Sequence, residues 1–393
     1  MQETLPRSIN AALDSVALSA FEDVGGLVAA LGGPDLIALD QGKTWFPPCV
    51  EPCAWTGEEF DLAAHEHAPP AGAPRLRNAI ASHLEDRGLR QAGADQILVT
   101  AGATHGVGLA IRAVVSPGDE VLVLSPQWLF AAGLVEAAGG HTVEVPVFLE
   151  LGREADFDLT TALAAAFTSR SRAIYFNTPN NPSGYSLRPG QLAEVATFAA
   201  EHDLWIIADN AYEIYDFTAA GFVDIASLPL AAERTFSVYT FSKTYAMPGY
   251  RVGYVVAPEE MVVRMQKWGL YSVYAVSTTS QFAALKALAT PDAALDERRD
   301  RARQARDMVM QELVVPHTPT SGGLYTFLDV GDWPGGAGTF VAEAVRAGVS
   351  LAPGTAFGRH CARWARLCFT AVDVDRLSLA LGRLNALWDG PAR

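Results

Sequence analysis

The stretch SVYTFSKTYAMPGYRVGYVVA, residues 237–257, decides both the fold class and the chemistry that we expect of this chain. It opens with an apolar run typical of a buried strand, continues through Lys243 and Arg251, and ends in a second apolar run. A lysine at the end of a buried strand is costly unless its charge is used or its pKa falls. Lys243 is therefore either a reactive amine or a solvated lysine on a surface turn, and this motif alone leaves both open.

Short apolar runs alternate with helical patterns between residues 96 and 257. Besides the two runs just quoted, they are ILVT at Ile97, EVLVLS at Glu120, AIYFN at Ala173 and LWIIAD at Leu204. Runs that are apolar throughout are typical of strands covered on both faces by helices. Helical stretches at 104–115 and 189–202 lie between them. This alternation predicts an α/β fold with a mostly parallel central sheet.

The pattern changes after about Gln281, which indicates a second, smaller domain. A long charged helix, two strand-like pieces and a closing helix are expected there, at 292–313, around Gly323 and Ala365, and at 373–388. The N-terminal segment is expected to complete this domain. We therefore predict three parts, namely residues 1–50 completing the small domain, a large domain over 51–285, and the small C-terminal domain over 286–393.

Composition and charge exclude several classes of partner. Half of the 393 residues are hydrophobic and 19% are charged, which is typical of a compact globular protein. The net charge of -15 argues against nucleic acid and acidic membranes. No apolar run reaches the roughly 18 residues of a membrane span, and no secretory signal is visible. We expect a cytoplasmic protein that binds neither nucleic acid nor membrane. The four cysteines suit neither a disulfide framework nor a zinc site, so no metal is expected.

Polar residues follow two of the predicted strands. Asp209 comes directly after an apolar run, at the carboxyl end of the sheet, where open α/β sheets bind ligands. There it is either a partner that keeps a pyridinium nitrogen protonated or a helix N-cap. Tyr212 lies three residues further on and could reach the phenolic oxygen of the same ring. Asn181 belongs to NTPNNPSG, residues 177–184, a composition that favours a tight turn for functional or purely structural reasons.

A third motif, TAGATHG at residues 100–106, lies between a predicted strand and a helix. Its small residues let the backbone approach a phosphate, and the amides at the start of the helix point toward it. The motif fits neither GxGxxG nor the GxxxxGK[ST] loop, which disfavours a dinucleotide or ATP site.

Together these motifs resemble those of the class I/II aminotransferases, which are fold-type I pyridoxal-phosphate enzymes. The resemblance runs from about Leu39 to Phe369, with the motifs in the order and spacing of that family. It implies a fold-type I fold, pyridoxal 5'-phosphate as cofactor, and an amino acid and a keto acid as substrates. It also implies a homodimer, since active sites of this family lie between subunits.

The resemblance assigns a role to each candidate residue. Lys243 is expected to hold the cofactor as a Schiff base and to move the substrate proton. Asp209 would pair with the pyridine nitrogen, while Tyr212 and Asn181 would bond the ring oxygen. The other cofactor contacts would come from a stacked Trp128 and from a phosphate site made by Ala103, Thr104, Thr240, Ser242 and Arg251. The substrate would be bound through its α-carboxylate by Arg366 and Gly42, with Asn181 and Trp128 beside it.

One substitution departs from the family pattern. In HEHAPPAGAPRLR, residues 65–77, His67 stands where the family has a tyrosine that reaches the cofactor phosphate of the neighbouring subunit. His67 either replaces that hydrogen bond or acts as an extra acid or base, because histidine titrates near neutral pH. The segment that borders the substrate side chain in the family carries Lys43, Trp45 and Phe46, which are therefore candidates for specificity.

Three functions are compatible with these motifs. The expected one is an aminotransferase that acts on an L-amino acid through Lys243. The alternative is a lyase, or a decarboxylating or cyclising enzyme acting on an unusual amino acid, because the same carbanion precedes several of these reactions. The third is a catalytically inactive binding or regulatory relative, against which the intact Lys243 and Asp209 argue.

Overall fold

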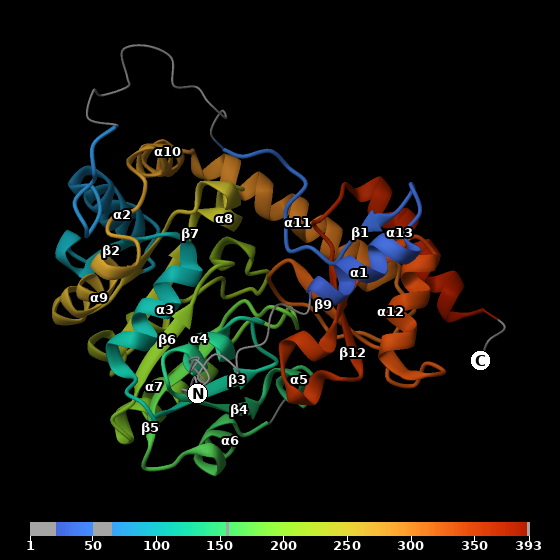
Figure 1. The fold of residues 1–393 in the computed structure, drawn as a ribbon, viewed down its shortest axis with the longest axis horizontal. Coiled ribbons are helices and arrows are strands. Elements are labelled where there is room, and N and C mark those ends of the chain that lie inside the picture. The colour runs from blue at the N-terminus through green and yellow to red at the C-terminus, as the bar shows by residue number, and fades with distance from the viewer. Residues whose placement is uncertain (1–20, 50–64, 155–156, 391–393) are drawn as a thin grey trace, which may run out of the picture.

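The computed structural model describes residues 21–49, 65–154 and 157–390 and is built around a seven-stranded sheet (Figure 1). The strand order is β2-β8-β7-β6-β5-β3-β4. The strands are β2 (Ile97–Thr100), β3 (Glu120–Ser125), β4 (His141–Pro146), β5 (Ser171–Asn177), β6 (Trp205–Asp209), β7 (Thr235–Thr240) and β8 (Gly253–Val256). Neighbouring strands from β7 to β4 run parallel, and β8 is antiparallel to both of its neighbours. The predicted α/β class with a mostly parallel sheet is confirmed.

Helices cover both faces of this sheet, which explains why its central strands are apolar throughout. Successive residues of β6 illustrate this, since Ile206 packs into one core and Ile207 into another on the opposite face. The helices α3 (Gly102–Val114) and α9 (Glu259–Ser272) pack together, and α3 lies against β6, β7 and β8. Elsewhere α6 (Leu159–Ala166) contacts β4 and α7 (Pro189–Glu201) contacts β6.

A second group of elements combines both ends of the described chain. It contains an antiparallel sheet of order β11-β12-β9 and a parallel pair of β1 with β10, in which Ile37 lies opposite Val349. Its elements are α1 (Phe21–Leu31), β1 (Ile37–Ala38), β9 (Tyr325–Asp329), α12 (Gly336–Arg346), β10 (Val349–Ser350), β11 (Ala352–Pro353), β12 (Trp364–Cys368) and α13 (Val374–Trp388). The N-terminal segment thus packs with the C-terminal residues, whereas the domain boundaries stay a prediction.

The long charged helix predicted over 292–313 is α11 (Asp292–Glu312), which connects the two groups. Figure 1 shows it running from α10 (Thr278–Leu288) toward α13. Its buried residues Ala302, Ala305 and Val309 belong to the core of the second group. Among residues 21–49, 65–154 and 157–390, no helix is both long and apolar enough to cross a membrane.

The remaining described helices are short or lie at the edge of the sheet. They are α2 (Pro74–Asp86), α4 (Ala131–Ala137), α5 (Phe148–Leu151), α8 (Phe241–Thr244) and the 3-10 turns η4 (Ala94–Gln96), η5 (Glu213–Tyr215), η6 (Ile225–Ser227), η7 (Ala232–Arg234), η8 (Pro248–Tyr250), η9 (Gly354–Phe357) and η10 (Arg359–Cys361). Two of them, η5 and α8, follow the carboxyl ends of β6 and β7; α8 carries residues of the site described next, and η5 directly follows Tyr212 of that site.

Candidate active site

The candidate residues from the sequence gather around one cavity of about 260 Å³ at the carboxyl ends of β6 and β7. Apart from His67 and the specificity candidates Lys43, Trp45 and Phe46, every candidate residue lines it, namely Gly42, Ala103, Thr104, Trp128, Asn181, Asp209, Tyr212, Thr240, Ser242, Lys243, Arg251 and Arg366. The cavity therefore joins residues from the central sheet with Gly42 and Arg366 of the second group.

Lys243 lies in the single helical turn α8, which begins directly after β7. Thr240 caps this turn, because its Oγ1 accepts a hydrogen bond from the amide of Ser242 at 3.1 Å. The side chain of Lys243 turns into the cavity, where Nζ donates to the carbonyl oxygen of Gly42. The predicted buried lysine is thus a residue of the cavity rather than of a surface turn.

The electrostatic surroundings favour the neutral form of Lys243. Burial lowers the pKa of its amine from 10.5 to about 8. The positive charges of Arg366 and Arg251 contribute to this fall, while Cys368 and Asp209 oppose it. A neutral amine is the form that attacks a carbonyl carbon, so this setting makes Lys243 reactive near physiological pH.

Asp209 is the last residue of β6 and is buried. One carboxylate oxygen accepts a hydrogen bond from Tyr175 Oη at 3.1 Å, and the other accepts one from the amide of Ala211 at 3.2 Å. Burial raises the pKa of Asp209 to about 6, while these two hydrogen bonds and Lys243 counteract the rise. A buried carboxylate that faces the cavity is suited to pair with a protonated ring nitrogen.

A chain of hydrogen bonds connects Arg366 with Tyr212. Arg366 Nη1 donates to Asn181 Oδ1 at 2.9 Å, and Asn181 Nδ2 donates to Tyr212 Oη at 3.3 Å. The Tyr212 hydroxyl also lies 3.0 Å from the hydroxyl of Tyr325, which likewise lines the cavity. Sequence reasoning missed Tyr325; its only signal was its place at the start of the strand-like piece after Gly323. It missed Leu129 and Phe130 too, which line the cavity and directly follow Trp128.

Arg366 is a buried cation positioned by aromatic rings. Its side chain is 1% exposed, and its Cζ lies 4.4 Å from the ring centre of Tyr325 and 4.8 Å from that of Phe357. Its Nη2 donates to the carbonyl oxygen of Asp40 at 2.6 Å. Because the guanidinium faces the cavity and is held in a fixed plane, it is suited to bind a carboxylate.

The start of α3 forms an anion cradle with Arg251. Gly102 has φ +78°, and a Cβ at this position would lie 2.4 Å from Arg251 Nη2, so only glycine fits. Ala103 and Thr104 follow in the first turn of the helix, where backbone amides have no partner inside the helix. Arg251 is held by the carbonyl oxygen of Pro248 at 2.8 Å. Two hydroxyls, those of Thr240 and Ser242, complete the cavity wall on this side.

Comparison with known proteins identifies the family. The family model described as aminotransferase class I and II matches residues 62–384. This chain belongs to that family. An aspartate aminotransferase of Pyrococcus abyssi is 32% identical over 91% of this chain and 92% of its own length. An aromatic-amino-acid aminotransferase of Thermococcus litoralis is 31% identical, again over 91% of this chain and 92% of its own. A solved mutant of the Thermus thermophilus aspartate aminotransferase has TM-score 0.86 at 28% identity, covering 97% of this chain and 100% of that one.

Class I and II aminotransferases depend on pyridoxal phosphate, and this chain is such an aminotransferase. The fold is therefore that of fold-type I, as the sequence predicted. These relatives are aminotransferases by name and give no support to the lyase alternative.

The residues of the cavity fit this cofactor. The anion cradle at Gly102 and Arg251 suits its phosphate, and the buried carboxylate of Asp209 suits its ring nitrogen. The lowered pKa of Lys243 suits a covalent bond to its aldehyde carbon. Trp128 lines the same cavity and offers an aromatic surface to the ring. When bound, pyridoxal phosphate supplies an electron sink for the charge left on the substrate α-carbon.

His67 does not reach this cavity. It is exposed, and its ring centre lies 5.1 Å from that of Tyr274 in an edge-to-face contact. Lys43 does not line the cavity either; its carbonyl oxygen accepts a hydrogen bond from Thr370 Oγ1 at 2.9 Å.

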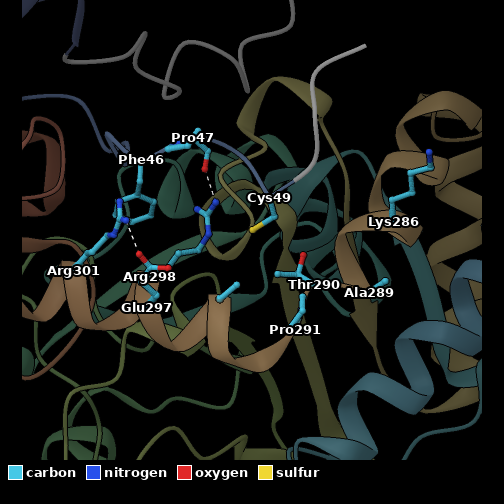
Figure 2. A pocket seen from close by; sticks show the side chains of 11 residues that line it. Phe46, Pro47, Cys49, Lys286, Ala289, Thr290, Pro291, Glu297, Arg298 and Arg301 are labelled. Atoms are coloured by element: carbon cyan, nitrogen blue, oxygen red, sulfur yellow. Dashed lines mark hydrogen bonds and ion pairs between the residues drawn. The ribbon is translucent and has the colours of Figure 1, made fainter. Parts of the chain in front are cut away.

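Trp45 and Phe46 lie against α11 rather than beside the catalytic cavity. The guanidinium of Arg301 lies 5.7 Å from the ring of Trp45, and that of Arg298 lies 5.1 Å from the ring of Phe46. Arg298 also donates to the carbonyl oxygen of Pro47. Figure 2 shows Phe46, Pro47, Arg298 and Arg301 around a separate pocket of about 440 Å³. None of the candidate catalytic residues lines this pocket.

Proposed function

We propose that this aminotransferase moves the amino group of an L-amino acid with an uncharged aromatic or aliphatic side chain to a 2-oxo acid. The cationic side chains among the described residues that line the cavity carry this proposal. They are Lys243, Arg251 and Arg366, and each already has a role toward the cofactor or the α-carboxylate. The same lining offers Trp128, Leu129 and Phe130 as apolar contacts for a side chain.

The names of the relatives alone do not fix the substrate. They include aspartate aminotransferases, an aromatic-amino-acid aminotransferase and an arginine–pyruvate transaminase, which is 34% identical over 85% of this chain. An acidic side chain needs a cation to offset its desolvation, and an apolar one needs only a water-free surface. The lining therefore favours uncharged substrates.

In this proposal Lys243 anchors the cofactor covalently through Nζ and later takes the proton from the substrate α-carbon. Its lowered pKa supports both steps, since each requires the neutral amine. Asp209 would keep the ring nitrogen protonated, and Tyr212 and Asn181 would donate hydrogen bonds to the ring oxygen. Trp128 would offer its aromatic face to the ring.

Substrate orientation is assigned to Arg366, which would bind the α-carboxylate in a bidentate manner while the amide of Gly42 contacts the same group. The anion cradle of α3, together with Thr240, Ser242 and Arg251, would hold the cofactor phosphate. These contacts fix the substrate α-carbon in front of Lys243, which is the positioning that the proton transfer requires.

A panel of amino acids tests the proposed substrate class. The holoenzyme is mixed with an L-amino acid at a series of concentrations, and the rates at which the 2-oxo acid and pyridoxamine phosphate form are measured by chromatography of quenched samples. We expect kcat/KM for L-phenylalanine, L-tyrosine and L-leucine to exceed that for L-aspartate by at least about tenfold. The side-chain carboxylate of aspartate would lose its hydration in the cavity without gaining a cationic partner. A preference for L-aspartate would contradict the proposal and would require a cation from outside the described lining.

We also propose that the active unit is a homodimer that buries the exposed end of α9. Apolar side chains follow one another at and just beyond the C-terminal end of α9 with high exposure, namely Trp268, Leu270, Tyr271, Val273 and Tyr274. Such a patch is typical of a protein interface. His67 contacts Tyr274 at this face, so a second copy would meet His67 there, consistent with a role toward the partner's cofactor phosphate.

Light scattering of the holoenzyme tests the dimer. Tyr271→Glu places a charge on a side chain that is 87% exposed and is expected to shift the mass toward the monomer. Leu379→Glu, on the 53% exposed Leu379 of α13, is the matched control and should leave the mass unchanged. A protein that stays dimeric with Tyr271→Glu would exclude this face as the dimer interface.

A cytoplasmic location remains a prediction from the sequence.

A further inference from the structure

Tyr325 is a buried tyrosine of the cavity to which the proposed mechanism gives no role. It is 1% exposed and begins β9. Its hydroxyl lies 3.0 Å from that of Tyr212, and its ring packs under the guanidinium of Arg366. A Cβ built on Gly42 would lie 2.2 Å from the same hydroxyl. Tyr325 thus touches three residues of the proposed site.

The hydrogen bonds of Asn181 determine which group occupies one lone pair of the Tyr212 hydroxyl oxygen. Asn181 Oδ1 accepts from Arg366 Nη1, because the opposite orientation of the amide would place two donors against each other. Asn181 Nδ2 therefore faces Tyr212 and donates to its oxygen. One lone pair of the Tyr212 oxygen is used in this way.

The direction of the bond between the two tyrosines follows from the surroundings of Tyr325. Its hydroxyl is confined by the backbone of Gly42, and Tyr212 is the one hydrogen-bond partner of that hydroxyl among the described residues. If the Tyr212 proton goes to the ring oxygen of the cofactor, as proposed above, it is not available to Tyr325, and the proton of this bond must come from Tyr325. Tyr325 therefore donates. Both lone pairs of the Tyr212 oxygen are then filled, and its own proton points into the cavity.

We propose that Tyr325 is a positioning residue that donates to Tyr212 and, together with Asn181, directs the Tyr212 proton onto the ring oxygen of the cofactor. This inference rests on the proposed role of Tyr212 toward that oxygen. Hydrogen bonds in a chain strengthen one another, so donation by Tyr325 makes Tyr212 a stronger donor. Both phenols stay protonated near neutral pH, since burial raises the pKa of Tyr325 to about 12 and that of Tyr212 well above its ordinary value.

The test is the pH midpoint of the visible absorbance of the bound cofactor in the holoenzyme without substrate. The midpoint is the pH at which half of the bound cofactor has lost the proton held close to its ring oxygen. Hydrogen-bond donors to that oxygen stabilise the deprotonated form and so lower the midpoint. Tyr325→Phe keeps the ring under Arg366 and removes only the hydroxyl. We expect its midpoint to rise by roughly 0.3–1 pH unit, because the hydrogen bond from Tyr212 to the ring oxygen becomes weaker without being lost. The KM for the amino acid should stay unchanged, because Arg366 keeps its contacts.

Two further variants separate the possible outcomes. Tyr212→Phe should raise the midpoint more than Tyr325→Phe, and the double variant should behave like Tyr212→Phe alone. Tyr185→Phe, which removes a hydroxyl bonded to Gln191 outside the cavity, is the matched control and should not move the midpoint.

If Tyr212→Phe shifts the midpoint and Tyr325→Phe does not, the role of Tyr325 is wrong while that of Tyr212 stands. Additive shifts in the double variant would also overturn it, since Tyr325 would then act without Tyr212. If neither single variant shifts the midpoint, the proposed role of Tyr212 itself fails.

Discussion

Tyr215 Oη donates a hydrogen bond of 3.1 Å to the carbonyl oxygen of Lys243. A second contact joins the same two turns, because Glu213 Oε1 accepts a hydrogen bond from Thr244 Oγ1 at 2.7 Å. Tyr215 and Glu213 belong to η5, which directly follows Tyr212, and Lys243 and Thr244 belong to α8. These two hydrogen bonds join the turn after Tyr212 to the turn that carries Lys243. We therefore expect the relative positions of Tyr212 and Lys243 to depend on them.

Tyr215→Phe tests this connection. The loss of one buried hydrogen bond, worth about 1 kcal/mol, should loosen the α8 turn and raise the cofactor dissociation constant roughly fivefold. Fluorescence titration of the apoprotein with pyridoxal phosphate measures this constant. Tyr185→Phe again serves as the control, and equal dissociation constants for the two variants would show that Tyr215 does not position Lys243.

Asp209→Asn should abolish most of the turnover while preserving the shape of the site. The amide cannot hold the ring nitrogen protonated, so kcat should fall at least about 100-fold, as when a preorganised electrostatic partner is removed. Single-turnover amino transfer measures this rate. Asp224→Asn changes a buried carboxylate that bonds Ser237 and Tyr239 outside the cavity. It should lower the melting temperature rather than kcat, and a similar kcat for both variants would speak against the role of Asp209.

Arg366→Lys should raise KM for the amino acid far more than it lowers kcat. Lysine cannot bind a carboxylate with two parallel hydrogen bonds, and the loss of about 2 kcal/mol corresponds to roughly a 30-fold increase. Arg363→Lys, at an exposed arginine paired with Asp329, is the matched control. Steady-state kinetics with several amino acids would reveal the effect, and an unchanged KM would rule out the α-carboxylate role.

The pKa of Lys243 predicts how the apoprotein captures its cofactor. Burial lowers this pKa from 10.5 to about 8, so the neutral amine is populated from about pH 8 upward. The second-order rate of pyridoxal phosphate capture should therefore rise with pH and level off above about pH 9. Between pH 8 and 10.5 only the unfolded chain keeps the proton, so the contribution of Lys243 to folding stability rises with pH in this window. Stopped-flow absorbance measures the capture rate, and a rate that still climbs steeply between pH 9.5 and 10.5 would be inconsistent with this pKa.

Gly42→Ala should disturb the cavity through Tyr325. The new methyl group would lie 2.2 Å from Tyr325 Oη, which is closer than any tolerable contact. We expect a loss of about 1–3 kcal/mol in the free energy of unfolding, as for an overpacked site. Removing the hydroxyl with Tyr325→Phe in the same chain should recover part of this loss, and a denaturation series of the two single variants and the double variant measures the recovery. If the losses simply add, the two groups do not clash.

The sequence predicted most of the fold because the central strands are covered on both faces. Runs such as the one at Ala173, in the central strand β5, are almost wholly apolar and need no alternation to be recognised. The edge strand β4 was missed, since it is partly exposed and its HTVEVP mixes polar and apolar residues. The placement of Asp209 and Lys243 followed from their positions at strand ends.

Contacts between distant segments could not be predicted from the sequence. Tyr325 meets Tyr212 across 113 positions, and that contact depends on how β9 packs against the turn after β6. Trp45 and Phe46 were expected beside the substrate but pack on arginines of α11. Tertiary packing decides which face of α11 meets the N-terminal segment, so this contact could not be predicted from the sequence. His67 lies outside the cavity of its own chain, so its role depends on a second copy.

The covalent attachment site of the cofactor tests the central claim most directly. The chain has four lysines, Lys43, Lys243, Lys267 and Lys286, and only Lys243 lines the catalytic cavity. Reduction of the holoenzyme with borohydride, digestion and peptide mass spectrometry would locate the label. Our account predicts the mass of the reduced cofactor on the peptide that contains Lys243, and none in Lys243→Ala. A label on another lysine, or a labelled Lys243→Ala protein, would contradict it.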